Sequence, residues 1–249
     1  MTVQYAGLYS FPKSGNTWMR EIIAALLFGD REDIPDMHEG PIHKAPTAIV
    51  QGSRTVRFYK SHRLSPLETT GGQAIDHFGF IYIVRHPLDV FLSYLNYLRV
   101  DSERLHVRAH VPYVSVGDLI KSGDIELFLD CFILYGTVQP DFVAPGSWFD
   151  NVRHWQTDVA TPERPVIILK YEDMVRNAAG TYDALAAFLG VDADRIDTAV
   201  KKANQKTRID GKFFWKQQPG LYKEMLPPAL IRKFEKFHGE TVRSLGYEL

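Results

Sequence analysis

Residues that could bind an anionic group stand near the start of the chain. Gly7-Leu8-Tyr9-Ser10-Phe11-Pro12-Lys13-Ser14 has the frame of a P-loop, G-x-x-x-x-G-K-[ST], with proline in place of the second glycine. A strand followed by a tight turn and a helix would present backbone N–H groups and a positive helix end to a phosphate. Lys13 adds a full charge. Neutral hydrogen-bond donors follow at Ser14, Asn16 and Thr17, and the ring of Trp18 offers a flat face suited to stacking on a base.

Pro12 argues against a typical nucleoside triphosphatase, which needs glycine at this position. A P-loop kinase would also require an acidic residue at a strand end to hold magnesium. The candidate strands Phe80–Val84 and Val166–Leu169 are followed instead by Arg85 and Lys170. By itself, the frame is also compatible with an ordinary strand–turn–helix that carries a solvated lysine.

The string Phe11–Trp18 closely resembles the 5′-phosphosulfate-binding loop of the cytosolic-type sulfotransferases, whose usual form is Tyr-Pro-Lys-Ser-Gly-Thr-Thr-Trp. These enzymes use 3′-phosphoadenosine-5′-phosphosulfate (PAPS) as donor. The departures at Phe11 and Asn16 are mild, because an aromatic ring and a donor are kept. The resemblance implies that the donor is bound by Lys13, Ser14, Gly15, Asn16, Thr17 and Trp18.

Lys60-Ser61-His62, at the end of the predicted strand Thr55–Lys60, resembles the family's Lys-Thr/Ser-His segment. In that family the histidine is the general base and the lysine contacts the sulfonate, so the resemblance implies catalytic roles for His62, Lys60 and Lys13. The chemistry requires such a base, because an acceptor hydroxyl attacks poorly until its proton is removed. Open α/β sheets bind ligands at the carboxyl ends of their strands, where His62 is predicted to lie.

The segment from Ile81 to Tyr94 resembles the family's 3′-phosphate site, in which an arginine leaves a strand and a serine follows eight residues later. Arg85 and Ser93 keep this separation, and arginine can hold a phosphate through two parallel N–H donors. His86 replaces the more usual asparagine, and we expect it to be structural.

Tyr171-Glu172-Asp173, after the strand Val166–Leu169, resembles the family's Tyr–Glu–Asp signature, whose tyrosine reaches toward the adenine. Glu172 and Asp173 could also form a paired carboxylate site for acid–base work or a metal. The resemblance favours a structural or helix-capping role for both.

The segment Arg208–Lys216 matches the family's last cofactor motif, Arg-Lys-Gly-x-x-Gly-x-Trp-Lys, only in part. Arg208, Trp215 and Lys216 keep the frame, whereas Ile209 replaces the family's lysine and both glycines are displaced. The resemblance implies a 3′-phosphate contact for Arg208, with Gly211 and Lys212 supplying the remaining contacts. The family's second adenine-stacking aromatic is not assigned, because the segment Lys202–Lys206 before Arg208 contains no aromatic residue.

These residues need a scaffold that gathers them at one edge. Short apolar runs alternate with segments of helical periodicity, which is typical of a mostly parallel sheet flanked by helices. We therefore predict an α/β fold with a P-loop-like phosphosulfate loop in one sulfotransferase domain over residues 1–249. The predicted strands are Gly7–Phe11, Thr55–Lys60, Phe80–Val84 and Val166–Leu169. The predicted helices are Thr17–Phe28, Pro87–Tyr97, Ile125–Val138, Ser147–Asp158, Ala179–Leu189, one capped by Asp192, and one from Pro227 toward His238. The segments predicted to be irregular are Gly29–Gln51, Asp101–Gly123 and Arg208–Leu226.

The bulk properties narrow the class of protein. The formal net charge of −1 gives no global field toward nucleic acid or membrane, so we expect neither as a partner. A single cysteine, Cys131, excludes an internal disulfide framework and fits a reducing compartment. The chain shows no secretory signal and no run of about 18 apolar residues, so we expect a cytoplasmic monomer or homodimer.

The resemblance implies transfer of a sulfonate group from PAPS to the hydroxyl of a small alcohol or phenol, leaving adenosine 3′,5′-bisphosphate (PAP) and requiring no metal. A carbohydrate acceptor is the alternative. A P-loop kinase and an inactive nucleotide-binding protein of the same fold are more distant possibilities. The candidate acceptor segments, Asp36–Gln51 and Tyr97–Tyr113, do not decide between acceptors. Their aromatic and basic rings are His38, His43, Tyr97, His106, His110 and Tyr113.

Overall fold

A five-stranded sheet forms the centre of the computed structural model, which describes residues 2–29, 34–35, 42–100, 113–176, 178–209 and 218–249. The strand order is β2-β3-β1-β6-β7, and only the edge strand β2 runs antiparallel to its neighbour. The strands are β1 (Gln4–Ser10), β2 (Thr47–Val50), β3 (Arg54–Ser61), β6 (His77–Val84) and β7 (Val166–Lys170). A separate two-stranded ribbon pairs β4 (Thr69–Thr70) with β5 (Gln73–Ala74). The predicted α/β fold with a mostly parallel sheet is confirmed.

The sheet is built from apolar runs because helices cover both of its faces. All eight residues of β6 are buried, which is typical of a central parallel strand. In the parallel register, Leu8 pairs with Lys60 on one side and with Ile81 on the other. The strands β1, β3, β6 and β7 therefore end at the same edge of the sheet, as the ligand site requires.

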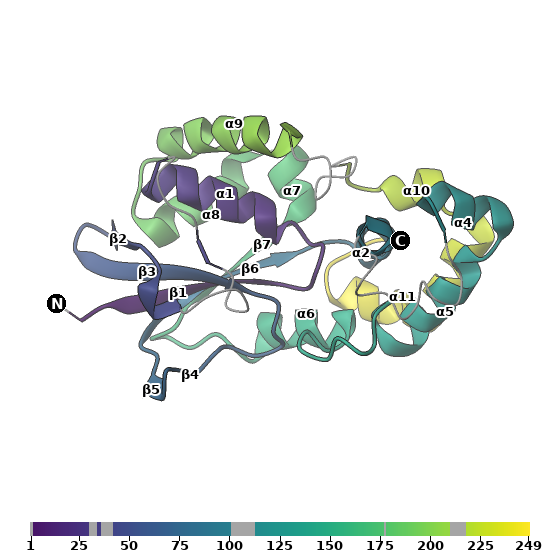
Figure 1. Cartoon of the computed structure of the whole chain (residues 1–249), viewed down its shortest axis with the longest axis horizontal. Helices are drawn as coiled ribbons and strands as arrows, with labels where there is room; N and C mark the ends of the chain where they lie inside the picture. The colour runs from purple at the N-terminus through teal and green to yellow at the C-terminus, as the bar shows by residue number, and fades with distance from the viewer. Residues whose placement is uncertain (1, 30–33, 36–41, 101–112, 177, 210–217) are drawn as a thin grey trace.

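Two layers of helices flank the sheet (Figure 1). One face is covered by α1 (Asn16–Leu27), α7 (Tyr171–Arg176), α8 (Ala178–Leu189) and α9 (Ala193–Ile209). The other face is covered by α6 (Trp148–Thr157), whose Trp155 stacks on Tyr82 of β6 at 5.3 Å between ring centroids. The sheet side chains are thus divided between two apolar clusters, one on each face.

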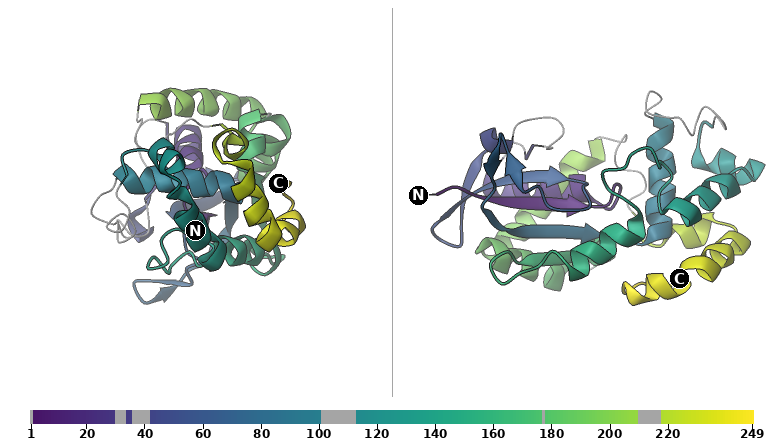
Figure 2. Two further views of the ribbon diagram at one scale, coloured as in Figure 1. Left: turned by 90° about the vertical axis from the view of Figure 1, so that its right-hand side faces the viewer. Right: turned by 90° about the horizontal axis from the view of Figure 1, so that it is seen from below.

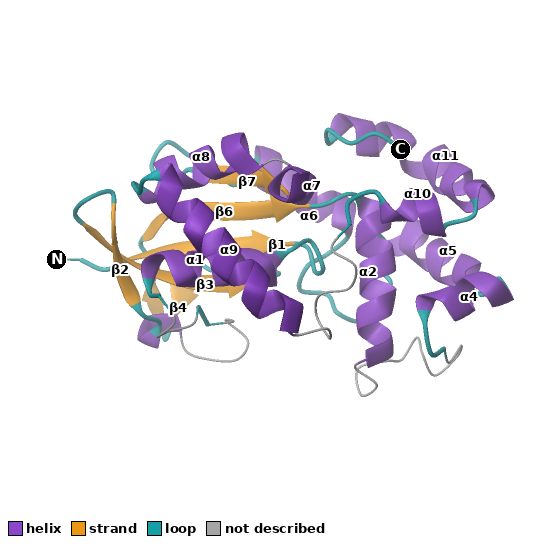
Figure 3. Ribbon diagram, turned by 90° about the horizontal axis from the view of Figure 1, so that it is seen from above, coloured by secondary structure: helices purple, strands orange, loops and turns teal. Residues whose placement is uncertain are grey.

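A further group of helices lies beyond the carboxyl ends of the strands (Figure 3). Its members are α2 (Pro87–Val100), α4 (Val116–Ser122), α5 (Ile125–Tyr135), α10 (Leu221–Met225) and α11 (Pro228–Ser244). Figure 2 shows the N-terminus at the opposite end of the molecule from this group. None of the helices in the described ranges combines the length and hydrophobicity of a membrane-spanning segment.

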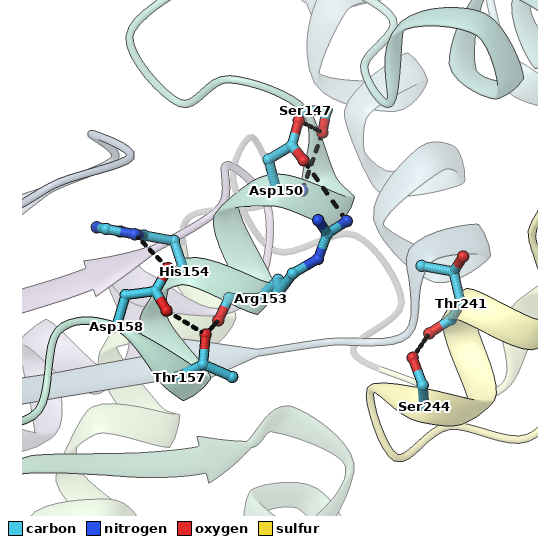
Figure 4. A network of polar contacts seen from close by, with 8 residues as sticks. All are labelled: Ser147, Asp150, Arg153, His154, Thr157, Asp158, Thr241 and Ser244. Atoms are coloured by element: carbon cyan, nitrogen blue, oxygen red, sulfur yellow. Dashed lines mark hydrogen bonds and ion pairs between the residues drawn. The ribbon is translucent and has the colours of Figure 1, made fainter.

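Helix α6 illustrates how local sequence sets the element boundaries. The Ser147 hydroxyl accepts the backbone N–H of Asp150 at 2.9 Å, which caps the helix start. On the exposed side, Asp150 pairs with Arg153, and His154 Nδ1 lies 3.1 Å from the Asp158 carboxylate (Figure 4). These surface contacts hold the helix, while its apolar face packs on the sheet. The buried face includes Trp148, Val152 and Trp155.

The predicted strands and helices are all found, with shifted ends. Helix α5 stops at Tyr135 rather than Val138, because Gly136 adopts a left-handed conformation (φ 65°) that closes the helix. Helix α11 continues to Ser244, past the predicted end near His238. The helix α7, directly after β7, was not predicted at all.

The three segments predicted to be irregular are in part regular, so that prediction is wrong in detail. The segment Gly29–Gln51 contains β2, Asp101–Gly123 contains α4, and Arg208–Leu226 contains α10. The elements β2, α4 and α10 are at most seven residues long. Such short elements owe their stability to tertiary contacts more than to local propensity, so sequence periodicity does not reveal them.

Candidate functional site

The turn between β1 and α1 has the geometry of a phosphate loop. Lys13 (φ 69°) and Gly15 (φ 108°) both adopt positive φ, which turns the chain sharply into the helix. The first helical hydrogen bond runs from Met19 N to Gly15 O at 3.1 Å. The N–H groups of the preceding helical residues therefore have no partner within α1 and point out of its positive end. An anion placed there would meet both the donors and the helix dipole.

The buried polar atoms at this site that lack a hydrogen-bond partner among the described residues include one hydroxyl and one guanidinium nitrogen. They are Oγ of Ser14, which is fully buried, and Nε of Arg85, which is 6% exposed as a residue. A buried polar group without a partner costs about 1–3 kcal/mol. Both atoms fit a ligand that carries phosphate oxygens, because such oxygens accept from a hydroxyl and from a guanidinium.

Three cations converge beside the loop. The pKa of Lys13 is lowered to about 8, mainly by burial and in addition by the charges of Arg85 and Lys60. The Lys13 ammonium lies 4.4 Å from the centroid of the Tyr97 ring, and Arg85 Nη1 donates to Lys13 O at 3.2 Å. Mutual repulsion of this kind is relieved by a bound anion, so the cluster favours a doubly charged phosphate or sulfate group.

Arg85 is held between an aromatic ring and the end of the sheet. Its guanidinium lies 4.3 Å from the centroid of the Tyr171 ring, and the Trp148 indole donates to its carbonyl at 3.2 Å. The Tyr171 ring in turn meets Trp18 edge to face, with 6.0 Å between centroids. Ser93, two turns into α2, is 9% exposed. The sheet end, α2 and α7 therefore bring Arg85 and Tyr171 beside the phosphate loop.

His62 lies directly after β3, with its ring tied to the end of β1. Its Nδ1 is 2.9 Å from the carbonyl oxygen of Ser10 and 3.4 Å from the Ser10 hydroxyl. A backbone carbonyl can only accept, so the shorter contact assigns the proton of the neutral ring to Nδ1. The basic lone pair is then on Nε2, the atom that a general base would use.

Two predicted cofactor residues use their side chains elsewhere. The amide nitrogen of Asn16 donates to Leu8 O at 3.3 Å and to the Ser10 hydroxyl at 3.2 Å, so the predicted ligand donor is already engaged. The indole of Trp18 donates to Asn204 Oδ1 at 2.9 Å, and Trp18 is only 8% exposed. Stacking of Trp18 on a base stays a prediction, as does a contact from the Thr17 side chain.

Of the predicted cofactor segment Arg208–Lys216, the structure describes only the backbone at its start. Arg208 lies in the last turn of α9. Gly211 and Lys212 lie outside the described residues, as do the candidate acceptor residues His38, His106 and His110. Of the other acceptor candidates, Tyr113 donates to Leu95 O, and the carbonyl of His43 accepts from Arg57. The contacts of Tyr113 and His43 are structural, whereas Tyr97 reaches the phosphate loop.

His86 and Glu172 are structural, as expected. The His86 ring stacks on Tyr222 with 4.2 Å between centroids, and its Nε2 lies 3.0 Å from Glu248 O. Burial lowers the pKa of His86 to about 3, so the ring is neutral. The Glu172 carboxylate accepts the backbone N–H of His86 at 2.8 Å and the hydroxyl of Tyr247 at 3.2 Å. In the described part of the chain, no group of three or more His, Cys, Asp or Glu side chains could hold a metal ion.

The sequence did not reveal two contacts that shape the site. The Asp89 carboxylate accepts the backbone N–H groups of Gly220 and Tyr222 at 2.6 and 3.0 Å, which ties α10 to the start of α2. The contact of Ser10 with His62 has no sequence signal beyond the position of Ser10 at the end of a strand.

Comparison with known proteins agrees with this geometry. A family model described as "Sulfotransferase domain" matches residues 7–246. Sulfotransferase 4A1 of Mus musculus is 24% identical over 245 residues, which cover 92% of this chain and 76% of the relative. The 3-alpha-hydroxysteroid sulfotransferase of Cavia porcellus is 25% identical over 193 residues, covering 73% of this chain and 57% of the relative.

The fold is shared with a solved structure that contains PAP. The crystal structure of mouse sulfotransferase SULT7A1 complexed with PAP superimposes with a TM-score of 0.63 and 20% sequence identity. The match covers 97% of this chain and 87% of the mouse chain. At this identity the similarity establishes the common fold.

Proposed function

The chain belongs to the sulfotransferase family, and we propose that it transfers a sulfonate group from PAPS to the hydroxyl of a small alcohol or phenol. The observation that carries this proposal is the meeting of a phosphate loop, three cations and a tautomer-fixed histidine at one sheet edge. Lys13 and Ser14 come from the turn after β1, Lys60 and His62 from the end of β3, and Arg85 from the end of β6. We take this unit as a single domain over residues 1–249.

We assign the donor to the cation cluster. Lys13 and the N–H groups at the start of α1 would hold the 5′-phosphate, while Lys60 would neutralise the sulfonate oxygens. Arg85, with Ser93 and Arg208, would hold the 3′-phosphate. Ser14 Oγ and Arg85 Nε have no hydrogen-bond partner in the described part of the chain, and this supports the assignment, because each would gain an acceptor from a phosphate. Gly15, Trp18 and Tyr171 would border the nucleotide, and Gly211 and Lys212 would complete its site.

His62 would act as the general base in a direct in-line transfer. Nε2 takes the proton from the acceptor hydroxyl while the acceptor oxygen forms a bond to sulfur. The bond between sulfur and the bridging phosphate oxygen breaks, and its electron pair leaves with PAP. Lys13 stabilises the charge that develops on that oxygen. Alignment of the reactants contributes roughly 7 kcal/mol or more to such a step, and preorganised cations contribute much of the rest.

Aromatic side chains support a phenol or other apolar alcohol as the acceptor. Phe11 meets Tyr94 edge to face at 6.4 Å between centroids, and Tyr94 lies 6.5 Å from Tyr97. Tyr97 in turn faces the Lys13 ammonium. Phe11 and Tyr94 are buried in the core, so of these three rings only the half-buried Tyr97 could meet an acceptor ring, which would place the acceptor hydroxyl near the cations. A carbohydrate acceptor would require more polar side chains here, as hydrogen-bond partners for its hydroxyl groups.

Calorimetry with the two nucleotides PAP and AMP tests the donor. PAP should bind at least about 10-fold more tightly, because a phosphate held by Arg85 through charge-assisted hydrogen bonds contributes on the order of 1.5–3 kcal/mol. Equal affinities for PAP and AMP would contradict the assignment of PAPS as the donor and would favour a nucleotide-dependent kinase instead. A screen of phenols, aliphatic alcohols and sugars with ³⁵S-labelled PAPS then identifies the acceptor class.

A further inference from the structure

We propose that Asn16 and Ser10 are positioning residues that hold the His62 ring with its proton on Nδ1 and its lone pair on Nε2. This inference rests on the proposed function for its catalytic meaning, since it concerns the base of that reaction. It is carried by a chain of hydrogen bonds that runs from the start of α1, through the end of β1, to the end of β3.

Ser10 contacts His62 through two oxygen atoms. The carbonyl oxygen lies 2.9 Å from Nδ1, and the hydroxyl oxygen lies 3.4 Å from the same nitrogen. The Nδ1–H group thus faces two acceptors on one residue. Ser10 is 1% exposed, so no solvent competes for these acceptors. The tautomer with its proton on Nε2 would leave the Nδ1 lone pair facing the lone pairs of the Ser10 carbonyl oxygen, which is unfavourable.

Asn16 fixes the position of Ser10. Its amide nitrogen donates to the Ser10 hydroxyl at 3.2 Å and to Leu8 O at 3.3 Å, and it lies 3.5 Å from Ser61 O. These acceptors belong to β1 and β3, so one side chain ties together the strands that carry Ser10 and precede His62.

The orientation of the Asn16 amide follows from its neighbours. If the amide were turned over, Oδ1 would face the carbonyl oxygens of Leu8 and Ser61, which cannot donate. In the observed orientation, Oδ1 is buried without a hydrogen-bond partner among the described residues. A buried oxygen in that state costs about 1–3 kcal/mol. The hydrogen bonds donated by the Asn16 amide nitrogen therefore set the orientation of this side chain, even though Oδ1 is left buried without a partner among the described residues.

The first test measures the tautomer directly. The ¹⁵N shifts of the imidazole nitrogens distinguish Nδ1–H from Nε2–H, and the variant His62→Gln identifies which signals belong to His62. In the unmodified chain we expect the Nδ1–H form alone. Asn16→Ala and Ser10→Ala keep the Ser10 carbonyl but remove the hydrogen bond that fixes its position, so in both we expect a minor Nε2–H population to appear beside the Nδ1–H form. Ser10→Ala removes one oxygen atom only, so it decides the matter if Asn16→Ala does not fold.

The second test separates positioning from general structural damage. A misplacement of about 1 Å can cost about 100-fold in rate, so Asn16→Ala should lower kcat roughly 10- to 100-fold while the Kd of PAP changes by less than about threefold. Asn151→Ala is the matched control, because Asn151 is also fully buried and donates to a backbone carbonyl, that of Pro145, at 2.7 Å. This control should lose stability and keep kcat.

The outcomes distinguish the two proposals. An unchanged His62 tautomer in folded Ser10→Ala and Asn16→Ala overturns the positioning role, and so does an equal loss of kcat in Asn151→Ala. A chain that shows the tautomer change but transfers no sulfonate to any acceptor retains the positioning role and loses the proposed function. The appearance of an Nε2–H population together with a selective fall in kcat supports both.

Discussion

Tyr171 packs so closely on Gly15 that a β-carbon at position 15 would lie 2.7 Å from Cδ2 of the tyrosine ring. Gly15 also has a φ of 108°, which side-chain-bearing residues rarely adopt. The two constraints are independent, because one concerns the backbone and the other a neighbouring ring. Together they explain why position 15 needs glycine: the loop packs against Tyr171 of α7 at this residue and turns into α1 directly after it.

Gly15→Ala should destabilise the protein and weaken PAP binding. The backbone strain alone costs about 1–2 kcal/mol, and the contact with Tyr171 forces the ring or the loop to move. Because Tyr171 also supports Arg85, the displacement should reach the phosphate site. Urea denaturation measures the free energy of unfolding, and calorimetry measures the Kd of PAP.

Gly52→Ala is the matched control for this prediction. Gly52 has a φ of 76°, and a β-carbon there would meet no atom within 4 Å. The control should show the backbone cost and leave the Kd of PAP unchanged. An equal effect of Gly15→Ala and Gly52→Ala on both quantities would contradict the role that we give to the Gly15–Tyr171 contact.

The affinity for PAP should fall as the pH rises through about 8. The pKa of Lys13 is lowered to about 8, first by burial and then by Arg85 and Lys60, so the free protein loses this charge above that pH. The phosphates are fully ionised from about pH 7 upward and bind more tightly to a protonated lysine than to a neutral one. Binding must then be accompanied by proton uptake, and the Kd should rise by up to about tenfold per pH unit.

Calorimetry between pH 7 and pH 9.5 measures this dependence. Lys13→Arg is the control, because arginine stays protonated throughout this range and should flatten the profile. An affinity that stays constant in the unmodified chain over the same range would show that Lys13 does not carry the charge that binds the phosphate.

Much of the scaffold could be predicted from local patterns. The run of apolar residues in β6 and the spacing of Pro12, Lys13 and Gly15 are properties of contiguous sequence, and both give correct elements. The short helices were not predictable in this way. Helix α10, for example, begins where Asp89 accepts the N–H groups of Gly220 and Tyr222, about 130 residues away in sequence.

The contacts within the site were less predictable than its residue types. His62 follows its strand as the sequence indicated, but its partner Ser10 is 52 residues away and comes from a different strand. Asn16 was expected to face a ligand, and its amide faces the sheet instead. Which way a polar side chain turns depends on the carbonyl groups that the fold brings near it, and periodicity carries no information on that choice.

His62→Ala should abolish sulfonate transfer while PAP still binds. A positioned general base contributes about 100- to 10,000-fold to a rate, whereas the phosphates are held by the cations and the loop. Single-turnover transfer from ³⁵S-labelled PAPS and calorimetry with PAP give the two quantities separately. A variant that keeps the full rate would show that another group removes the acceptor proton, and one that binds no PAP would show that His62 supports the loop.

The stability of the protein should decrease as the pH falls below about 6.5, in part because of His86. Burial lowers the pKa of this histidine to about 3, so the unfolded chain takes up a proton at a pH where the folded chain does not. A lowered histidine pKa means that its contribution is present above the unfolded pKa and is lost on acidification. Between pH 7 and pH 5 the expected loss is roughly 2 kcal/mol. Asp89 and Glu172 act in the opposite direction, because burial raises the pKa of each.

The variant His86→Phe isolates this contribution, because phenylalanine keeps a ring against Tyr222 and removes the titration. Its free energy of unfolding should be lower at pH 7, since the hydrogen bond to Glu248 O is lost, but should fall by roughly 2 kcal/mol less on going to pH 5. Urea titrations of both proteins at the two pH values give the comparison. Equal losses would mean that His86 is protonated in the folded protein at pH 5, which would contradict its burial between Tyr222 and Tyr247.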